Sequence, residues 1–188
     1  MIYGKYQASR DAAWRCLIDF KISSLPINVA KLSAAAGIKV VANSATSYLK
    51  TGEFGLSILR DDQWIIVYDD FMPRQRSRFT VAHELGHIFL GHQLNANKYY
   101  RSFALDKPDE EIEADVFASR LLAPACVLWG LEVFSAAQIA EICDISNQSA
   151  QIRYERFETL KKRNKFLSSP LERQVYQNFY NFIQRNKK

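Results

Sequence analysis

The chain has 188 residues, of which 48% are hydrophobic and 24% are charged, values typical of a soluble globular protein with one domain and a small appendage. No stretch approaches the roughly 18 uninterrupted apolar residues of a membrane helix, and residues 1–14 contain no apolar run, so neither membrane insertion nor export is expected. The three cysteines, Cys16, Cys126 and Cys143, form no Cys-x-x-Cys pair. This excludes a cysteine zinc ribbon and favours reduced thiols in a cytoplasmic protein.

The net charge of +5 is concentrated in the last part of the chain. Residues 1–150 hold 15 basic and 17 acidic side chains, whereas residues 151–188 hold 10 basic and 3 acidic ones. A solvated helical face accounts for this basic tail better than a nucleic-acid interface does.

The first third of the chain contains both helical and strand patterns. Apolar residues at helical spacing predict a helix over residues 9–20. Asn28 can cap a second, short helix, and residues 38–41 then predict a strand. Two β-rich runs, residues 54–59 and 64–68, are joined by Arg-Asp-Asp-Gln and predict a hairpin. An edge strand of such a sheet could hold an extended peptide by main-chain pairing.

Residues 78–90 contain His-Glu-x-x-His within an apolar, helix-compatible run. On a helix turning about 100° per residue, His83 and His87 lie about 40° apart, so both imidazoles can reach one cation. Glu84 lies about 60° from His87, where its carboxylate can act as general base toward a water on the metal. Zinc is the expected ion, because it accepts imidazole readily and lowers the pKa of its water to about 7 without redox chemistry. The alternative is a pair of structural histidines on an ordinary amphipathic helix.

Residues 91–109 show no clear period and are expected to form a loop over the site. Tyr99 or Tyr100 could donate a hydrogen bond to an oxyanion, although packing or exposure is the commoner role of a tyrosine. His92 lies about 180° around the helix from His83. In metalloproteases with three histidine ligands the third would fall at position 93, which is glutamine here. His92 is therefore expected to be a helix-end residue and not a ligand.

A second helix, between Pro108 and Pro124, is expected to supply the third ligand. A catalytic zinc needs three protein ligands and one open position, so a glutamate from this helix would complete a His-His-Glu set. Glu113 adjoins the apolar stripe of the helix and is the favoured ligand, with Glu110, one turn earlier, as its competitor. Glu110 and Glu111 also fit the acidic first turn that the helix dipole favours.

Two motifs carry a family resemblance. Arg-x-Arg-Phe-Thr-x-Ala-His-Glu-Leu-Gly-His spans residues 76–87, and Glu-x-Glu-Ala-x-x-Phe-Ala-x-x-Leu-Leu-x-Pro spans residues 111–124. Together they resemble the ImmA/IrrE family of metallopeptidases, and the resemblance covers roughly residues 28–157. One departure is Ala123, where the family often has methionine.

The resemblance implies a zincin-like fold of the gluzincin type in which His83, His87 and Glu113 bind zinc. It also implies that Glu84 is the catalytic carboxylate. Members of the family often lie in mobile elements or stress-response loci and cleave a helix-turn-helix repressor. A protein substrate is therefore the expected partner.

Residues 135–157 have the spacing of a helix-turn-helix. Ser135 and Ser146 can cap its two helices, although Asp144 occupies the turn position where glycine is common. The basic residues on or beyond the second helix are Arg153, Arg156, Lys161, Lys162 and Arg163. Nucleic-acid binding through residues 135–165 is not favoured, because such a helix pair is also a regular part of the resembling fold and can simply pack on the core. Ser169 and Pro170 then open one final amphipathic helix.

These patterns predict an α+β protein in three parts. Residues 1–130 would form a zincin-like metallopeptidase domain with a small sheet packed on the metal helix. Residues 131–166 would form the helix-turn-helix-like segment, and residues 167–188 the C-terminal amphipathic helix. The expected function is a zinc-dependent endopeptidase acting on a protein. The alternative is a DNA-binding or partner-sequestering regulator in which the zinc site is structural or vestigial.

Overall fold

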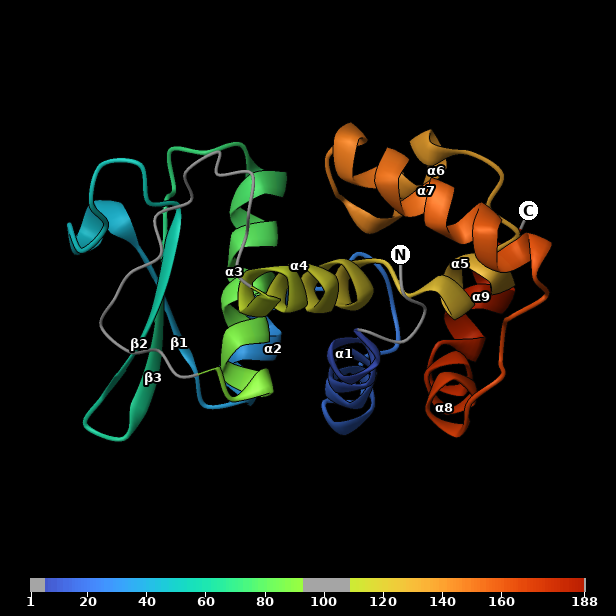
Figure 1. Cartoon of the computed structure of the whole chain (residues 1–188), viewed down its shortest axis with the longest axis horizontal. Coiled ribbons are helices and arrows are strands. Elements are labelled where there is room, and N and C mark those ends of the chain that lie inside the picture. The colour runs from blue at the N-terminus through green and yellow to red at the C-terminus, as the bar shows by residue number, and fades with distance from the viewer. Residues whose placement is uncertain (1–5, 93–108, 188) are drawn as a thin grey trace. The chain divides into compact units, whose positions relative to one another are not determined.

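The computed structural model describes residues 6–92 and 109–187 (Figure 1). The chain divides into two compact units, which we call the first unit (Met1–Ser9 with Asn28–Ala118) and the second unit (Arg10–Ile27 with Ser119–Lys188). The division falls inside the helix Asp109–Leu122, whereas the sequence places the end of the metallopeptidase domain at residue 130. Among the described helices, none combines the length and the apolar composition needed to span a bilayer.

The first unit contains a three-stranded sheet of β1 (Lys39–Ala42), β2 (Gly55–Arg60) and β3 (Gln63–Tyr68). The strand order is β1-β3-β2, with β1 parallel and β2 antiparallel to the central β3. Arg60 pairs with Gln63, so Asp61 and Asp62 alone form the turn, with φ angles of 50° and 59°. Aspartate tolerates these left-handed angles, and such a turn matches the twist of the strands it joins. The predicted hairpin is confirmed.

The longest helix of the first unit is α3 (Arg74–Leu90), which contains the His-Glu-x-x-His motif. The others are α2 (Val29–Ala35), the short 3-10 helix η1 (Asn43–Ala45) and α4 (Asp109–Leu122). α3 packs against β2, β3 and α2, and its other side meets α4 (Figure 1). A small sheet packed on the motif helix is the α+β arrangement predicted from the sequence, which is thereby confirmed.

Two glycines let the backbones around α3 approach one another. A Cβ on Gly55 of β2 would collide with the Thr80 side chain and lie 3.0 Å from Glu84 Oε1. A Cβ on Gly86 would lie 3.1 Å from Ala114 Cα and 3.2 Å from Ala114 O on α4. Because Gly86 is inside the His-Glu-x-x-His motif, this close approach determines how near α4 comes to the two histidines.

Replacing Gly86 by valine should therefore push α4 away from α3. We expect a loss of about 1–3 kcal/mol in the free energy of unfolding, the usual cost of overpacking. Glycine inside a helix is normally less favourable than other residues, so a loss of stability here would report the contact with Ala114. Denaturant unfolding measures it, with Ala34→Val at an exposed position of α2 as control. A stability equal to that of the wild type would contradict this packing of α4 on α3.

The second unit is entirely helical in its described residues. It holds most of α1 (Gln7–Asp19), followed by α5 (Ala125–Gly130), α6 (Ala136–Cys143), α7 (Asn147–Lys162), α8 (Pro170–Asn178) and α9 (Tyr180–Asn186). The predicted caps are present: Ser135 accepts from Gln138 N–H, and Ser146 accepts from Ser149 N–H. Asp144 takes the left-handed conformation, with φ of 51°, at the turn between α6 and α7.

The end of the chain differs from the prediction of one final helix. The helix is broken at Phe179, which separates α8 from α9 and has φ and ψ of −91° and 0°. No glycine or proline stands at the break. Phe179 at the break is fully buried, and so are Val175 before it and Ile183 after it. The apolar period therefore continues through the break, which is why the sequence does not reveal it.

Candidate metal centre

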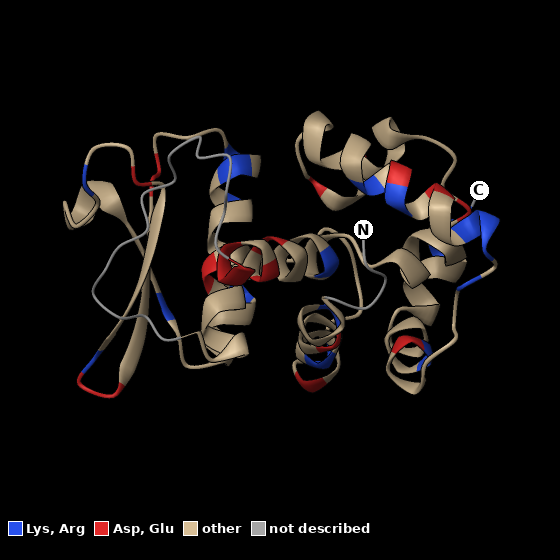
Figure 2. Cartoon of the chain, in the orientation of Figure 1, with Lys and Arg blue, Asp and Glu red and all other residues tan. Residues whose placement is uncertain are grey.

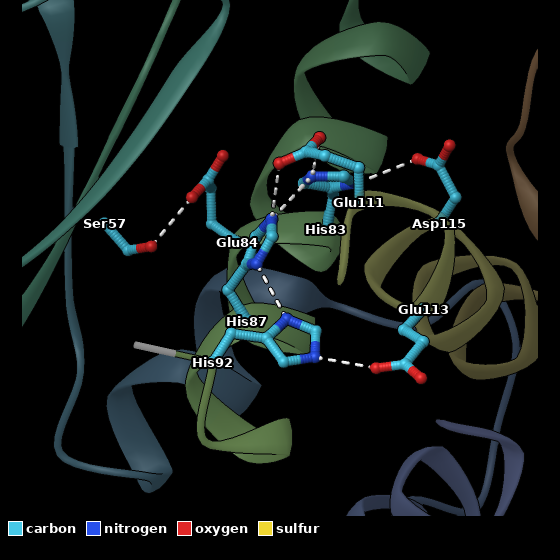
Figure 3. Close-up of polar contacts among 8 residues, drawn as sticks. All are labelled: Ser57, His83, Glu84, His87, His92, Glu111, Glu113 and Asp115. Carbon is cyan, nitrogen blue, oxygen red and sulfur yellow. Dashed lines mark hydrogen bonds and ion pairs between the residues drawn. The ribbon is translucent and has the colours of Figure 1, made fainter. Parts of the chain in front are cut away.

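The His-Glu-x-x-His motif lies on the buried part of α3. His83 and His87 are one turn apart, and their Nε2 atoms approach to 3.0 Å (Figure 3). Both side chains are buried, as is that of Glu84. The spacing of four residues on a helix thus brings the two imidazoles to one point, as the sequence predicts.

Glu111 of α4 completes the cluster. Its carboxylate oxygens lie 3.3 Å from His83 Nε2 and 3.2 Å from His87 Nε2. Burial opposes ionisation of this carboxyl, but hydrogen bonds from the two histidines and their positive charge outweigh burial and lower its pKa below the ordinary value. Glu111 is therefore held in the ionised form that a metal ligand requires.

The donor atoms of these three residues fit a tetrahedral zinc site. Ligands bound to zinc at about 2.0–2.2 Å in tetrahedral geometry lie roughly 3.3–3.6 Å apart. The two Nε2 atoms lie 3.0 Å apart, and the two Glu111 oxygens lie close to that range, with Oε1 3.2 Å from His87 Nε2 and Oε2 3.3 Å from His83 Nε2. Among the described residues, His83, His87 and Glu111 are the group whose ligand atoms converge in this way. Two imidazoles and one carboxylate also form a donor set of catalytic zinc enzymes.

The position of Glu111 corrects the choice of Glu113 as third ligand. Ala114 of α4 packs against Gly86, and the residues that share its side of the helix toward α3 are Glu111 and Asp115. Glu113 is about 200° from Glu111 around the helix, and its carboxylate lies 3.0 Å from His92 Nε2 instead. Glu110, the competing candidate, is exposed. We therefore take Glu111 as the candidate ligand.

Asp115 was not anticipated from the sequence. Its Oδ1 lies 2.9 Å from His83 Nδ1, the ring nitrogen opposite the one that faces Glu111. A carboxylate there accepts a hydrogen bond from Nδ1–H and leaves Nε2 as the ring nitrogen that can bind a cation. The sequence does contain a pattern that could have identified Glu111 and Asp115. They are two acidic residues four positions apart, which share one face of a helix.

Glu84 occupies the sheet side of α3 (Figure 3). Its Oε2 accepts a hydrogen bond of 2.7 Å from the hydroxyl of Ser57, a buried residue of β2. The hairpin thereby holds the carboxylate on the sheet side of the His83–His87–Glu111 cluster and not among its ligand atoms. This is the place expected for a general base. The contact with Ser57 joins residues 27 positions apart, and no local pattern predicts it.

Two other candidate groups have different outcomes. Tyr99 and Tyr100 lie outside the described residues.

Figure 2 shows acidic residues gathered on the first half of α4 and basic residues at the end of α7. Arg153, however, is 2% exposed, and its Nε donates to the carbonyl oxygen of Ala123 at 2.7 Å. Arg153 is therefore a structural residue of the second unit. Of the two arginines on the second helix of the helix-turn-helix-like segment, Arg156 is the exposed one.

Comparison with known families agrees with this geometry. A family model described as Peptidase_M78, IrrE N-terminal-like domain, matches residues 34–131. The match contains both motifs and all members of the metal cluster. Among curated proteins no match was found.

Proposed function

Because the chain belongs to the IrrE N-terminal-like (Peptidase_M78) family, the metallopeptidase family predicted from its motifs, we propose that it is a zinc-dependent endopeptidase acting in the cytoplasm. The observation that carries this proposal is the convergence of His83, His87 and Glu111 with Glu84 beside them. The three cysteines are buried and form no disulfide, which is in keeping with a reducing compartment.

In the proposed mechanism, His83, His87 and Glu111 would hold the ion. When bound, zinc supplies a Lewis acid that polarises a peptide carbonyl and lowers the pKa of water to about 7. Glu84 takes the proton of the attacking water and passes it to the leaving amine, so the C–N bond breaks with one water consumed. Ser57 holds the Glu84 carboxylate in place through its 2.7 Å hydrogen bond.

The substrate would lie along β2. Within the described sheet this strand is at an edge, because it pairs with β3 on one side. It also carries Ser57, which donates a hydrogen bond to Glu84, and Gly55, where an added Cβ would lie 3.0 Å from Glu84 Oε1. An extended segment added to such an edge is held by main-chain hydrogen bonds, which bring its peptide groups past the base. The resemblance to the ImmA/IrrE family favours a helix-turn-helix repressor as the protein that supplies this segment.

Intact-mass analysis of repressor digests tests the proposal. We would incubate the zinc-loaded protein with purified helix-turn-helix repressors, starting with the one encoded nearest to its own gene. The expected result is a pair of fragments whose masses add up to the repressor plus one water. Chelation should stop the reaction and added zinc should restore it. A zinc-loaded protein that binds a repressor without cutting it would instead indicate sequestration.

A further inference from the structure

The His87 imidazole has a second contact, on the side away from the metal cluster. Gly91 caps the end of α3, and its φ of 69° turns the chain so that His92 N–H donates to the carbonyl oxygen of His87 at 3.1 Å. The turn brings His92 Nδ1 to 2.9 Å from His87 Nδ1. The other ring nitrogen of His92, Nε2, lies 3.0 Å from Glu113 Oε2 (Figure 3).

The direction of these hydrogen bonds follows from the groups that make them. An ionised carboxylate can only accept, so Glu113 requires His92 to donate from Nε2. A neutral imidazole that donates from Nε2 has a lone pair on Nδ1, so His92 accepts at Nδ1. His87 must then donate from its own Nδ1. Its Nε2 faces Glu111 and His83, and loss of the proton on this nitrogen leaves a lone pair there for a cation.

We propose that His92 and Glu113 form a positioning relay that fixes the tautomer and the orientation of His87 for metal binding. The inference rests on the proposed function, because it assigns the relay to the same metal centre. It parallels the arrangement at His83, whose Nδ1 has a carboxylate acceptor directly, at 2.9 Å from Asp115. Outer partners of this kind orient a ligating histidine and increase its basicity. The role also explains why Glu113 faces away from the cluster.

The test measures the affinity for zinc alone, by competition with a chromophoric chelator, together with the absorption spectrum of the Co²⁺-loaded protein. We expect His92→Phe, which removes the acceptor, to weaken zinc binding about 10- to 100-fold, the usual effect of losing an outer partner. His92→Gln keeps an acceptor oxygen and should restore part of the affinity. A changed Co²⁺ spectrum in His92→Phe would report an altered ligand geometry.

Glu113 contacts His92, and His92 contacts His87. This order gives a sharper expectation for Glu113. Glu113→Ala should weaken binding in the wild-type background but have no further effect in His92→Phe, because Glu113 acts only through His92. Glu110→Ala is the matched control, since it removes an exposed carboxylate from the same helix. His92→Phe could lower the unfolding temperature of the metal-free protein. In that case the zinc affinity of Glu113→Ala tests the relay, because the Glu113 side chain is one-third exposed (33%) and its removal leaves the core intact.

The outcomes separate the relay from the function on which it rests. If the wild type binds zinc and both His92→Phe and Glu113→Ala bind it as tightly as the wild type does, the relay is overturned and the metallopeptidase proposal stands. Additive losses in the double variant would also overturn it. Wild type that binds no zinc would overturn both.

Discussion

Glu84→Gln is expected to keep its zinc and to lose peptide cleavage by about 10²- to 10⁴-fold, the usual contribution of a general base. Glutamine has the size of glutamate and can still accept the hydrogen bond from Ser57, which is 2.7 Å long in the native protein. It cannot take a proton from water. Cleavage of a proteome-derived peptide library, read by mass spectrometry, measures the loss even while the natural substrate is unidentified.

The control for this variant is Glu141→Gln, the same substitution at an exposed position of α6. It should cleave the library at the wild-type rate. Zinc content must be measured on the same preparations, so that a loss of metal is not mistaken for a loss of the base. A Glu84→Gln protein that cleaves as wild type does would show that Glu84 is not the proton acceptor.

Glu111→Ala is expected to abolish stoichiometric zinc binding. The variant leaves two imidazoles as protein ligands, and a zinc site of this class needs three. The loss of affinity should exceed the roughly 10- to 100-fold effect of outer partners, and cleavage should be lost with the metal. Zinc content by mass spectrometry of the untagged protein, before and after incubation with zinc, measures it.

Glu113→Ala and Glu110→Ala distinguish the three glutamates. Glu113→Ala should bind about one zinc per chain with reduced affinity, and Glu110→Ala should bind as wild type does. A protein that loses zinc on replacement of Glu113 but keeps it on replacement of Glu111 would support the ligand inferred from the sequence alone. It would contradict the orientation of α4 toward the two histidines.

Local patterns predicted local features well. The hairpin turn, the serine caps of α6 and α7 and the pairing of His83 with His87 depend on residues at most four positions apart. In each case the physical cause is contained in the segment itself: a turn conformation, a capping hydroxyl or one helical turn.

Features that depend on contacts between segments were harder to predict. The face that α4 turns to the histidines is set by the approach of Ala114 to Gly86, and a rotation of the helix exchanges Glu111 for Glu113. Arg153 resembled a surface cation in the sequence. Its partner, the Ala123 carbonyl just beyond the end of α4, is a group that a helix end leaves without an internal partner and that only the fold brings near.

The most direct test of the metal centre is anomalous diffraction at the zinc edge from crystals grown with zinc. We expect one strong peak at about 2.0–2.2 Å from the Nε2 atoms of His83 and His87 and from a carboxylate oxygen of Glu111. A peak coordinated by Glu113, or no peak at the two histidines in zinc-saturated crystals, would contradict the proposed centre.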